Sequence, residues 1–207
     1  LGDVYKRQLL YCVEINGRRN LYLMELATGD AVQLTEGDAL DDYGAMISAD
    51  DKSVYYQQDR KVWKLDLATL QRTCLYAAPD GWDCGNWGMS DDNRYLVMTE
   101  TRRDTLPDLT GKKGWEFFPL TCAAKPLCHI VYLDTQTGEH HIVVEDRCWF
   151  GHAQLRPGDP DTILFCHEGP YDMIDARLWL IQSDGSRYRC APVSYTHLRA
   201  HETLSDL

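Results

Sequence analysis

The residues best suited to chemistry in this 207-residue chain lie in one short segment, residues 165–179. Within eleven residues it carries an imidazole, three carboxylates and a guanidinium: His167, Glu168, Asp172, Asp175 and Arg177. A planar guanidinium binds a carboxylate through two parallel hydrogen bonds, so Arg177 is a candidate anchor for an acidic ligand. The structural alternative is that His167 or Glu168 caps a turn and that Arg177 pairs with Asp175.

A second candidate is His152, at the end of the sequence WFGH (149–152). It precedes an expected strand and could reach the same face as the 165–179 segment. A packed, structural histidine is the alternative. Trp82, Trp87 and Trp115 lie in segments expected to be exposed; aromatic rings of this kind bind sugars, although burial in a core is the commoner use.

The elements that position these residues follow from an internal repeat. An alternating apolar strand followed by a turn occurs four times, at residues 21–29, 62–70, 130–138 and 178–185. A Ser/Asp turn leading into a strand occurs at 47–56 and 89–98, with a diverged copy at 155–165. Thr28 and Thr69 are 41 residues apart, and Ser48 and Ser90 are 42 residues apart.

Units of about forty residues, each with short strands of period two, are typical of β-propeller blades. The sequence therefore predicts an all-β fold, a partial β-propeller of about three to four blades; a β-sandwich is the structural rival. The repeat is interrupted once, at residues 101–127, by a segment rich in lysine, proline and aromatic residues. A long insertion of this kind is either functional or a plain surface excursion.

Both ends of the chain match translated sequencing-adapter DNA. Residues 2–8 (GDVYKRQ) and 193–203 (VSYTHLRAHET) are the translations of the two strands of a transposase mosaic end and its adapter. We therefore expect residues 1–8 and 193–207 to be non-native tails that pack poorly, and residues 9–192 to form the propeller domain. On this interpretation His197 and His201 carry no functional weight.

Composition narrows the functional classes. The chain is 44% hydrophobic and 26% charged, which excludes a disordered or fibrous class. With 21 basic and 32 acidic residues the net charge is -11, so we expect no nucleic-acid partner. No apolar run approaches a membrane span, and we expect no membrane association. The eight cysteines form no C-x-x-C pair, so we expect no zinc site and mostly buried, reduced thiols.

Four stretches carry a resemblance to a known family. They are AVQLTEG (31–37), WFGH (149–152), FCHEGP (165–170) and IDARLWL (174–180). On these the chain resembles the oligogalacturonate lyases, over nearly all of residues 9–192 and about the first half of the family's length. The last two stretches are specific, whereas the LTEG turn is shared with many propellers of the TolB and WD40 type. The resemblance implies a seven-bladed propeller of which this chain holds an N-terminal part.

The resemblance also implies a function. The family cleaves short pectin-derived oligogalacturonides by β-elimination in the cytoplasm of microbes, with a histidine base and a manganese ion. Arg177 matches the family's substrate-binding arginine. His152, His167, Glu168 and Asp175 are expected near the substrate.

The base and the metal ligands lie beyond the native segment. We therefore expect no metal site and no manganese bound in this chain, which is predicted to be an inactive fragment. The alternative is a non-catalytic TolB-like scaffold or binding protein.

Overall fold

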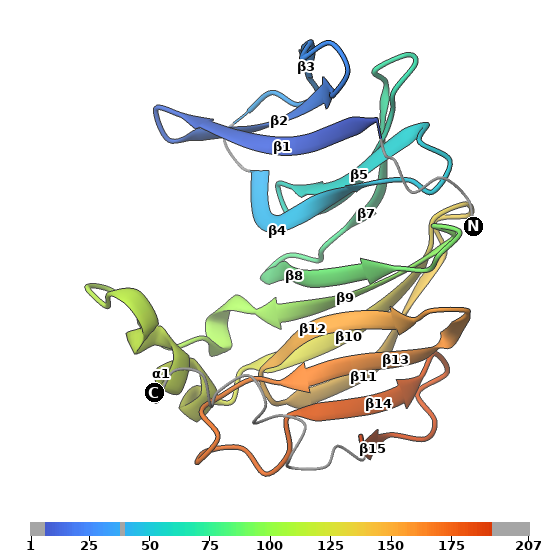
Figure 1. Cartoon of the computed structure of the whole chain (residues 1–207). Helices are drawn as coiled ribbons and strands as arrows, with labels where there is room; N and C mark the ends of the chain where they lie inside the picture. The colour runs from blue at the N-terminus through green and yellow to red at the C-terminus, as the bar shows by residue number, and fades with distance from the viewer. Residues whose placement is uncertain (1–6, 38–39, 192–207) are drawn as a thin grey trace, which may run out of the picture. The chain divides into compact units, whose positions relative to one another are not determined.

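The computed structural model describes residues 7–37 and 40–191, which form antiparallel β-sheets with little helix (Figure 1). The chain divides into two compact units, residues 1–80 and 81–207, and each is described by itself. Each unit contains two sheets in its described part. The predicted all-β class is confirmed, and the number of blades in a complete ring stays a prediction.

The first unit contains a three-stranded sheet and a four-stranded sheet, both meanders. The strands of the first are β1 (Gln8–Ile15), β2 (Arg18–Glu25) and β3 (Ala31–Gln33). The strands of the second are β4 (Leu40–Ile47), β5 (Ser53–Gln58), β6 (Lys61–Asp66) and β7 (Arg72–Ala77). Asn16 and Gly17 join β1 to β2 with φ angles of 54° and 77°, the left-handed pair that a tight hairpin requires.

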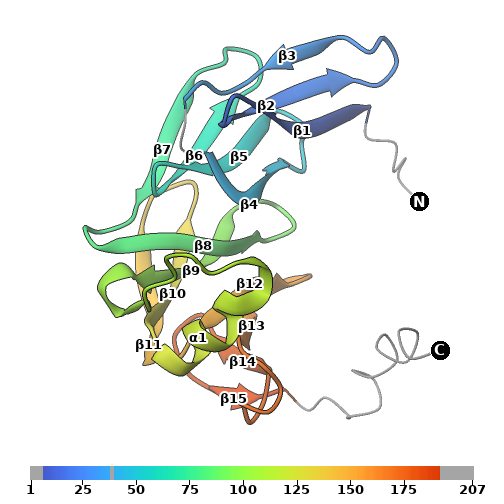
Figure 2. The same ribbon diagram turned by 90° about the vertical axis from the view of Figure 1, so that its left-hand side faces the viewer.

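The second unit contains two four-stranded antiparallel sheets. The first consists of β8 (Trp82–Met89), β9 (Tyr95–Arg102), β10 (Leu127–Asp134) and β11 (His140–Arg147). The second consists of β12 (Phe150–Arg156), β13 (Asp159–His167), β14 (Leu178–Gln182) and β15 (Arg189–Cys190). Between β9 and β10 the predicted insertion forms two 3-10 turns, Arg103–Thr105 and Gly114–Glu116, and a short helix, α1 (Phe117–Ala124). The helix lies at the end of both sheets (Figures 1 and 2).

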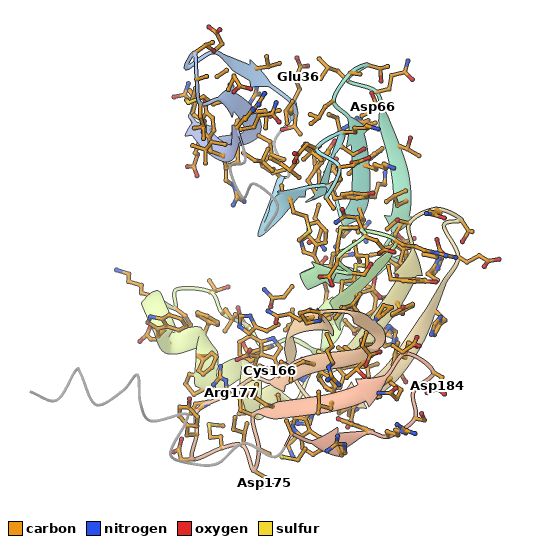
Figure 3. The ribbon with its side chains drawn as sticks, turned by 45° about the vertical axis from the view of Figure 1, so that its right-hand side comes forward. Glu36, Asp66, Cys166, Asp175, Arg177 and Asp184 are labelled. Atoms are coloured by element: carbon orange, nitrogen blue, oxygen red, sulfur yellow. The ribbon has the colours of Figure 1, made fainter. Side chains whose placement is uncertain are left out.

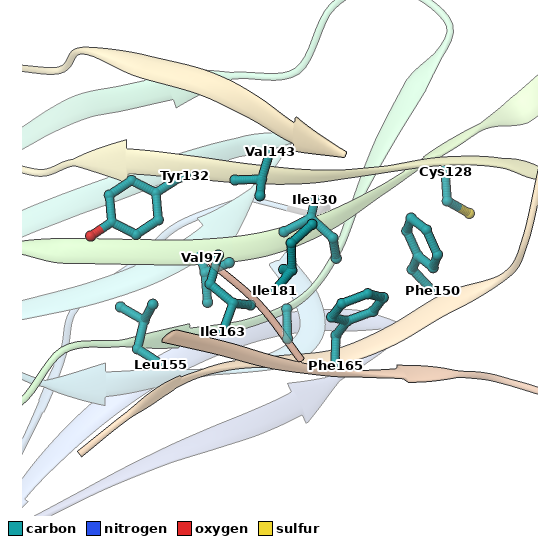
Figure 4. Close-up of a cluster of buried hydrophobic side chains, with 11 residues drawn as sticks. Val97, Cys128, Ile130, Tyr132, Val143, Phe150, Leu155, Ile163, Phe165 and Ile181 are labelled. Atoms are coloured by element: carbon teal, nitrogen blue, oxygen red, sulfur yellow. The ribbon is translucent and has the colours of Figure 1, made fainter. Parts of the chain in front are cut away.

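The facing sides of these two sheets form one buried core. Figure 4 shows aliphatic and aromatic side chains of β9, β10 and β11 packed against those of β12, β13 and β14. Ile130, Ile163 and Phe165 are fully buried. Burial of this kind stabilises the pair of sheets by about 1.5–3 kcal/mol for each large apolar side chain, and it fixes the strand ends that carry the candidate site.

The repeated turns form by equivalent hydrogen bonds. The Ser48 hydroxyl donates to Asp50 (2.6 Å) and accepts from the Ser53 N–H (2.9 Å). The Ser90 hydroxyl donates to Asp92 (2.6 Å) and accepts from the Tyr95 N–H (2.9 Å). Short polar side chains close such turns by bonding nearby backbone groups, so the sequence repeat is a repeat of turn chemistry.

The cysteines differ from what the sequence predicts. All eight cysteines are free, but the expectation that most are buried is wrong: five are not, and Cys12, Cys74 and Cys190 are exposed.

Strand β1 begins at Gln8, so the last residue of the predicted N-terminal tail pairs with Glu25, and residues 193–207 lie outside the described part of the chain. No helix in the described residues is long and apolar enough to span a membrane.

The second unit also contains a buried histidine between two carboxylates. The ring of His129 stacks on Trp82 with a centroid separation of 3.7 Å. Its Nε2 lies 2.6 Å from the Glu145 carboxylate and its Nδ1 lies 3.5 Å from the buried Glu100 carboxylate. Burial lowers the pKa of His129, but the two carboxylates outweigh it and the pKa is raised above its ordinary value.

We predict that protonated His129 stabilises the fold and that this contribution is lost as the pH rises. A raised pKa in the folded state contributes stability that is complete below the unfolded pKa and is lost as pH rises through the folded pKa. In urea unfolding of the wild type, the free energy of unfolding should therefore fall between pH 5.5 and pH 9. The fall should be absent in His129→Gln and should remain in His140→Gln, the exposed control. Parallel curves for wild type and His129→Gln would refute the prediction.

Candidate active site

The predicted cluster lies in the loop that joins β13 to β14. Strand β13 ends at His167, whose N–H donates to the carbonyl of Arg177 (2.9 Å). The N–H of Glu168 donates to the carbonyl of Trp149, immediately before β12 (2.7 Å). These two bonds close the base of the loop, so its polar side chains are held by strand pairing.

Arg177 and Glu168 form a close ion pair. The guanidinium Nη2 donates to Glu168 Oε2 at 2.7 Å, and Nη1 donates to the carbonyl of Gly169 at 3.4 Å. The Glu168 side chain is 7% exposed and that of Arg177 is 24% exposed. A guanidinium has five N–H groups, and these two bonds use two of them, so Arg177 is held in place with donors left for a ligand.

The same carboxylate also faces His152. The imidazole Nε2 of His152 lies 3.3 Å from Glu168 Oε1, and its side chain is 60% exposed. Strand β12 bulges here, because His152 and Ala153 stand opposite Phe165 alone, and His152 has a φ of 51°. A β-bulge re-aims a side chain and is common beside functional sites.

Gly151 makes the close approach of Glu168 possible. A Cβ atom at this position would lie 2.5 Å from Glu168 Oε1 and 2.7 Å from Glu168 Cγ. Only glycine leaves that space, so the WFGH sequence and the loop glutamate are fitted to each other. The glutamate is therefore the centre of the site, with Arg177 on one of its oxygens and His152 on the other.

His167 is placed differently. Its ring stacks on Trp179 (centroids 4.5 Å apart) and on Phe150 (5.5 Å), and its Nε2 lies 2.9 Å from the Tyr188 hydroxyl. Burial lowers the pKa of His167 to about 4, so the ring is neutral at pH 7. This geometry favours packing over substrate contact, in contrast to the exposed His152.

Asp175 is exposed on the outer part of the loop (Figure 3). The structural alternative paired Arg177 with Asp175, whereas the structure pairs Arg177 with Glu168. The nearer carboxylate is thus the buried one, and an ion pair with a buried partner holds its geometry better than an exposed pair.

Helix α1, within the insertion at residues 101–127, forms a wall of the site. The guanidinium carbon of Arg177 lies 6.0 Å from the centre of the Phe118 ring and 5.6 Å from that of Tyr171. Gly169, with a φ of 155°, lies against the helix: a Cβ there would be 2.4 Å from Cys122 Sγ. The interruption of the repeat and the aromatic content of residues 101–127 marked this segment in the sequence, but neither signal placed it beside Arg177.

The site lacks the clustered donors that a metal centre needs in the part of the chain that the structure describes. No group of three or more His, Cys, Asp or Glu side chains in residues 7–37 and 40–191 is placed to hold an ion. His152 and Glu168 approach each other, but Glu168 is already paired with Arg177. The site in this part of the chain is therefore a guanidinium, a carboxylate and an imidazole.

Comparisons with known proteins agree on one family. The family model described as oligogalacturonate lyase matches residues 4–201. An oligogalacturonate lyase of Dickeya dadantii is 38% identical over 184 residues, 88% of this chain and 47% of that protein. A solved structure of an oligogalacturonate lyase in complex with manganese is 38% identical, with a TM-score of 0.82 over 89% of this chain and 49% of that one.

A more distant structure shows the fold alone. TolB from Acinetobacter baumannii is 16% identical, with a TM-score of 0.57 over 88% of this chain and 39% of that one. Together with the four antiparallel sheets, these structures fit a β-propeller fold. The chain spans about half the length of the curated relatives that it matches.

Proposed function

Because this chain belongs to the oligogalacturonate lyase family, we propose that it is part of an enzyme that cleaves short, pectin-derived oligogalacturonides by β-elimination. The observation that carries the proposal is the Arg177–Glu168 pair: a guanidinium held by a buried carboxylate and still one quarter exposed. A uronate has one carboxylate per sugar ring, and a held arginine fork is the protein group that best matches it.

The chemistry requires a cation at that carboxylate. A base removes the proton from C5, the electron pair forms the C4=C5 double bond, and the C4–O glycosidic bond breaks with its oxygen taking a proton. Negative charge builds up on the carboxylate as the C5 proton leaves. A guanidinium at that position stabilises the transition state more than the ground state, and it therefore raises turnover.

Within this chain the roles are divided as follows. Arg177 binds the substrate carboxylate, and Glu168 fixes the position of Arg177. The exposed His152 contacts the sugar beside that carboxylate. We assign the base and the manganese ligands of the family to residues outside 9–192, so no step here passes through a metal and the chain by itself is inactive. We further propose that the enzyme acts in the cytoplasm and has no nucleic-acid or membrane partner.

The test is an assay of the full-length gene product with digalacturonate and trigalacturonate. Elimination splits the glycosidic bond without adding water, whereas hydrolysis adds one water molecule across it. Mass spectrometry should therefore show, for both substrates, products whose masses sum to that of the substrate. Cleavage with one added water molecule, or no cleavage, would refute the proposal.

A further inference from the structure

The indole of Trp115 has no role in the function proposed above. Trp115 is 77% exposed, the largest exposure among the large hydrophobic side chains described. Trp82 and Trp87, the other two tryptophans considered as sugar platforms, are each 8% exposed and belong to the core. Of these three tryptophans, Trp115 is the one that offers an exposed ring face to a ligand.

The ring of Trp115 is held by its neighbours and is not a loose surface group. It stacks on Phe117 (centroids 5.8 Å apart, planes at 23°) and meets the edge of Phe118 (6.0 Å, 89°). Phe118 packs on Trp149 at 5.3 Å. The turn below is closed by the Lys113 N–H, which donates to the Glu116 carboxylate (2.7 Å). A platform held in this way loses little entropy when it is covered.

The same residues connect this platform to the arginine. The Phe118 ring lies 6.0 Å from the guanidinium carbon of Arg177 and 6.0 Å from the centre of the Trp115 ring. Trp149 accepts the hydrogen bond that fixes Glu168. The exposed, basic Lys112 and Lys113 precede Trp115 in a chain whose net charge is -11. The exposed aromatic face of Trp115 is therefore linked to Arg177 through the Phe118 ring, and two basic residues precede it in the sequence.

We propose that Trp115 is the stacking platform of a second sugar subsite, which binds the galacturonate ring next to the one held by Arg177. A galacturonate ring has an apolar face of C–H groups and a carboxylate at its edge. The ring face suits an indole, and the carboxylate suits the ammonium groups of the two lysines. This inference rests on the proposed function, since it assumes that Arg177 binds a uronate.

The experiment measures binding to this 207-residue chain by saturation-transfer NMR, with galacturonate and trigalacturonate as probes. Trp115→Ala should weaken trigalacturonate binding about tenfold, equivalent to about 1.4 kcal/mol, and leave galacturonate binding unchanged. Trp115→Phe should retain most of the affinity. The matched control is Ile142→Ala, which truncates another exposed hydrophobic side chain of the same unit.

The outcomes separate this inference from the proposed function. If Trp115→Ala binds trigalacturonate as wild type does while Arg177→Lys loses it, the second subsite is wrong and uronate binding stands. If wild type binds neither sugar, the second subsite is refuted, and the proposed function is decided separately by the elimination assay of the full-length enzyme. If Trp115→Ala changes only the oligomeric state in light scattering, the ring contacts a second copy of the chain and the subsite is refuted.

Discussion

Replacing Glu168 with glutamine is expected to lower the free energy of unfolding by about 3 kcal/mol. The side chain is 7% exposed and its carboxylate lies 2.7 Å from the Arg177 guanidinium. Removing one partner leaves the other charge without compensation in a mostly dry environment, which costs more than the net contribution of the intact pair. Urea unfolding at pH 7 measures the change.

A second ion pair provides the control. Arg102 and Asp104 lie 2.8 Å apart, but their side chains are 47% and 65% exposed. Asp104→Asn should therefore change stability by less than about 1 kcal/mol. The double variant Glu168→Leu/Arg177→Met should recover most of the stability lost in Glu168→Gln, because two apolar groups need no partner. A Glu168→Gln variant as stable as wild type would show that the buried pair is not what holds the loop.

Replacing Arg177 with lysine in the full-length enzyme is expected to reduce kcat/KM on trigalacturonate about 30-fold, which corresponds to about 2 kcal/mol of lost interaction with a charged group. A lysine keeps the positive charge but loses the planar fork. The reduction should appear in kcat as well as in KM, because the carboxylate needs the cation most when charge develops on it.

The control for this variant is Arg189→Lys, in strand β15, which belongs to the same sheet as β13 and β14. It makes the same chemical change at an exposed arginine away from Glu168. Steady-state kinetics should show both constants within about twofold of wild type for this control. An Arg177→Lys enzyme with unchanged kcat would make the arginine a binding group without a role in the chemical step.

The strand repeat could be predicted from sequence because its causes are local. The Ser48 and Ser90 turns are each closed by a hydroxyl and a carboxylate two residues on, and the alternating strands follow from a period of two. Arg177 could be singled out because a single motif carries it. The number and arrangement of blades in a complete ring depend on long-range packing, which local sequence patterns do not determine.

The centre of the site could not be predicted, because its contacts join separate strands. Glu168 meets His152 only because β12 bulges and because Gly151 leaves room for the carboxylate. His167 is a histidine like His152, but its ring stacks on Phe150 and Trp179, which lie outside the FCHEGP motif. The helix beside Arg177 is short and is held in place by tertiary contacts with Gly169, not by its own helical periodicity.

The most direct test of the central claim, that Arg177 binds the substrate carboxylate during elimination, uses trigalacturonate and its methyl ester with the full-length enzyme. The ester has the same shape but lacks the negative charges. Arg177→Lys should lower kcat/KM about 30-fold on the acid and less than about threefold on the ester, so that the preference for the acid shrinks about tenfold. An equal loss on the two substrates would show that Arg177 does not act on the carboxylate and would contradict the account.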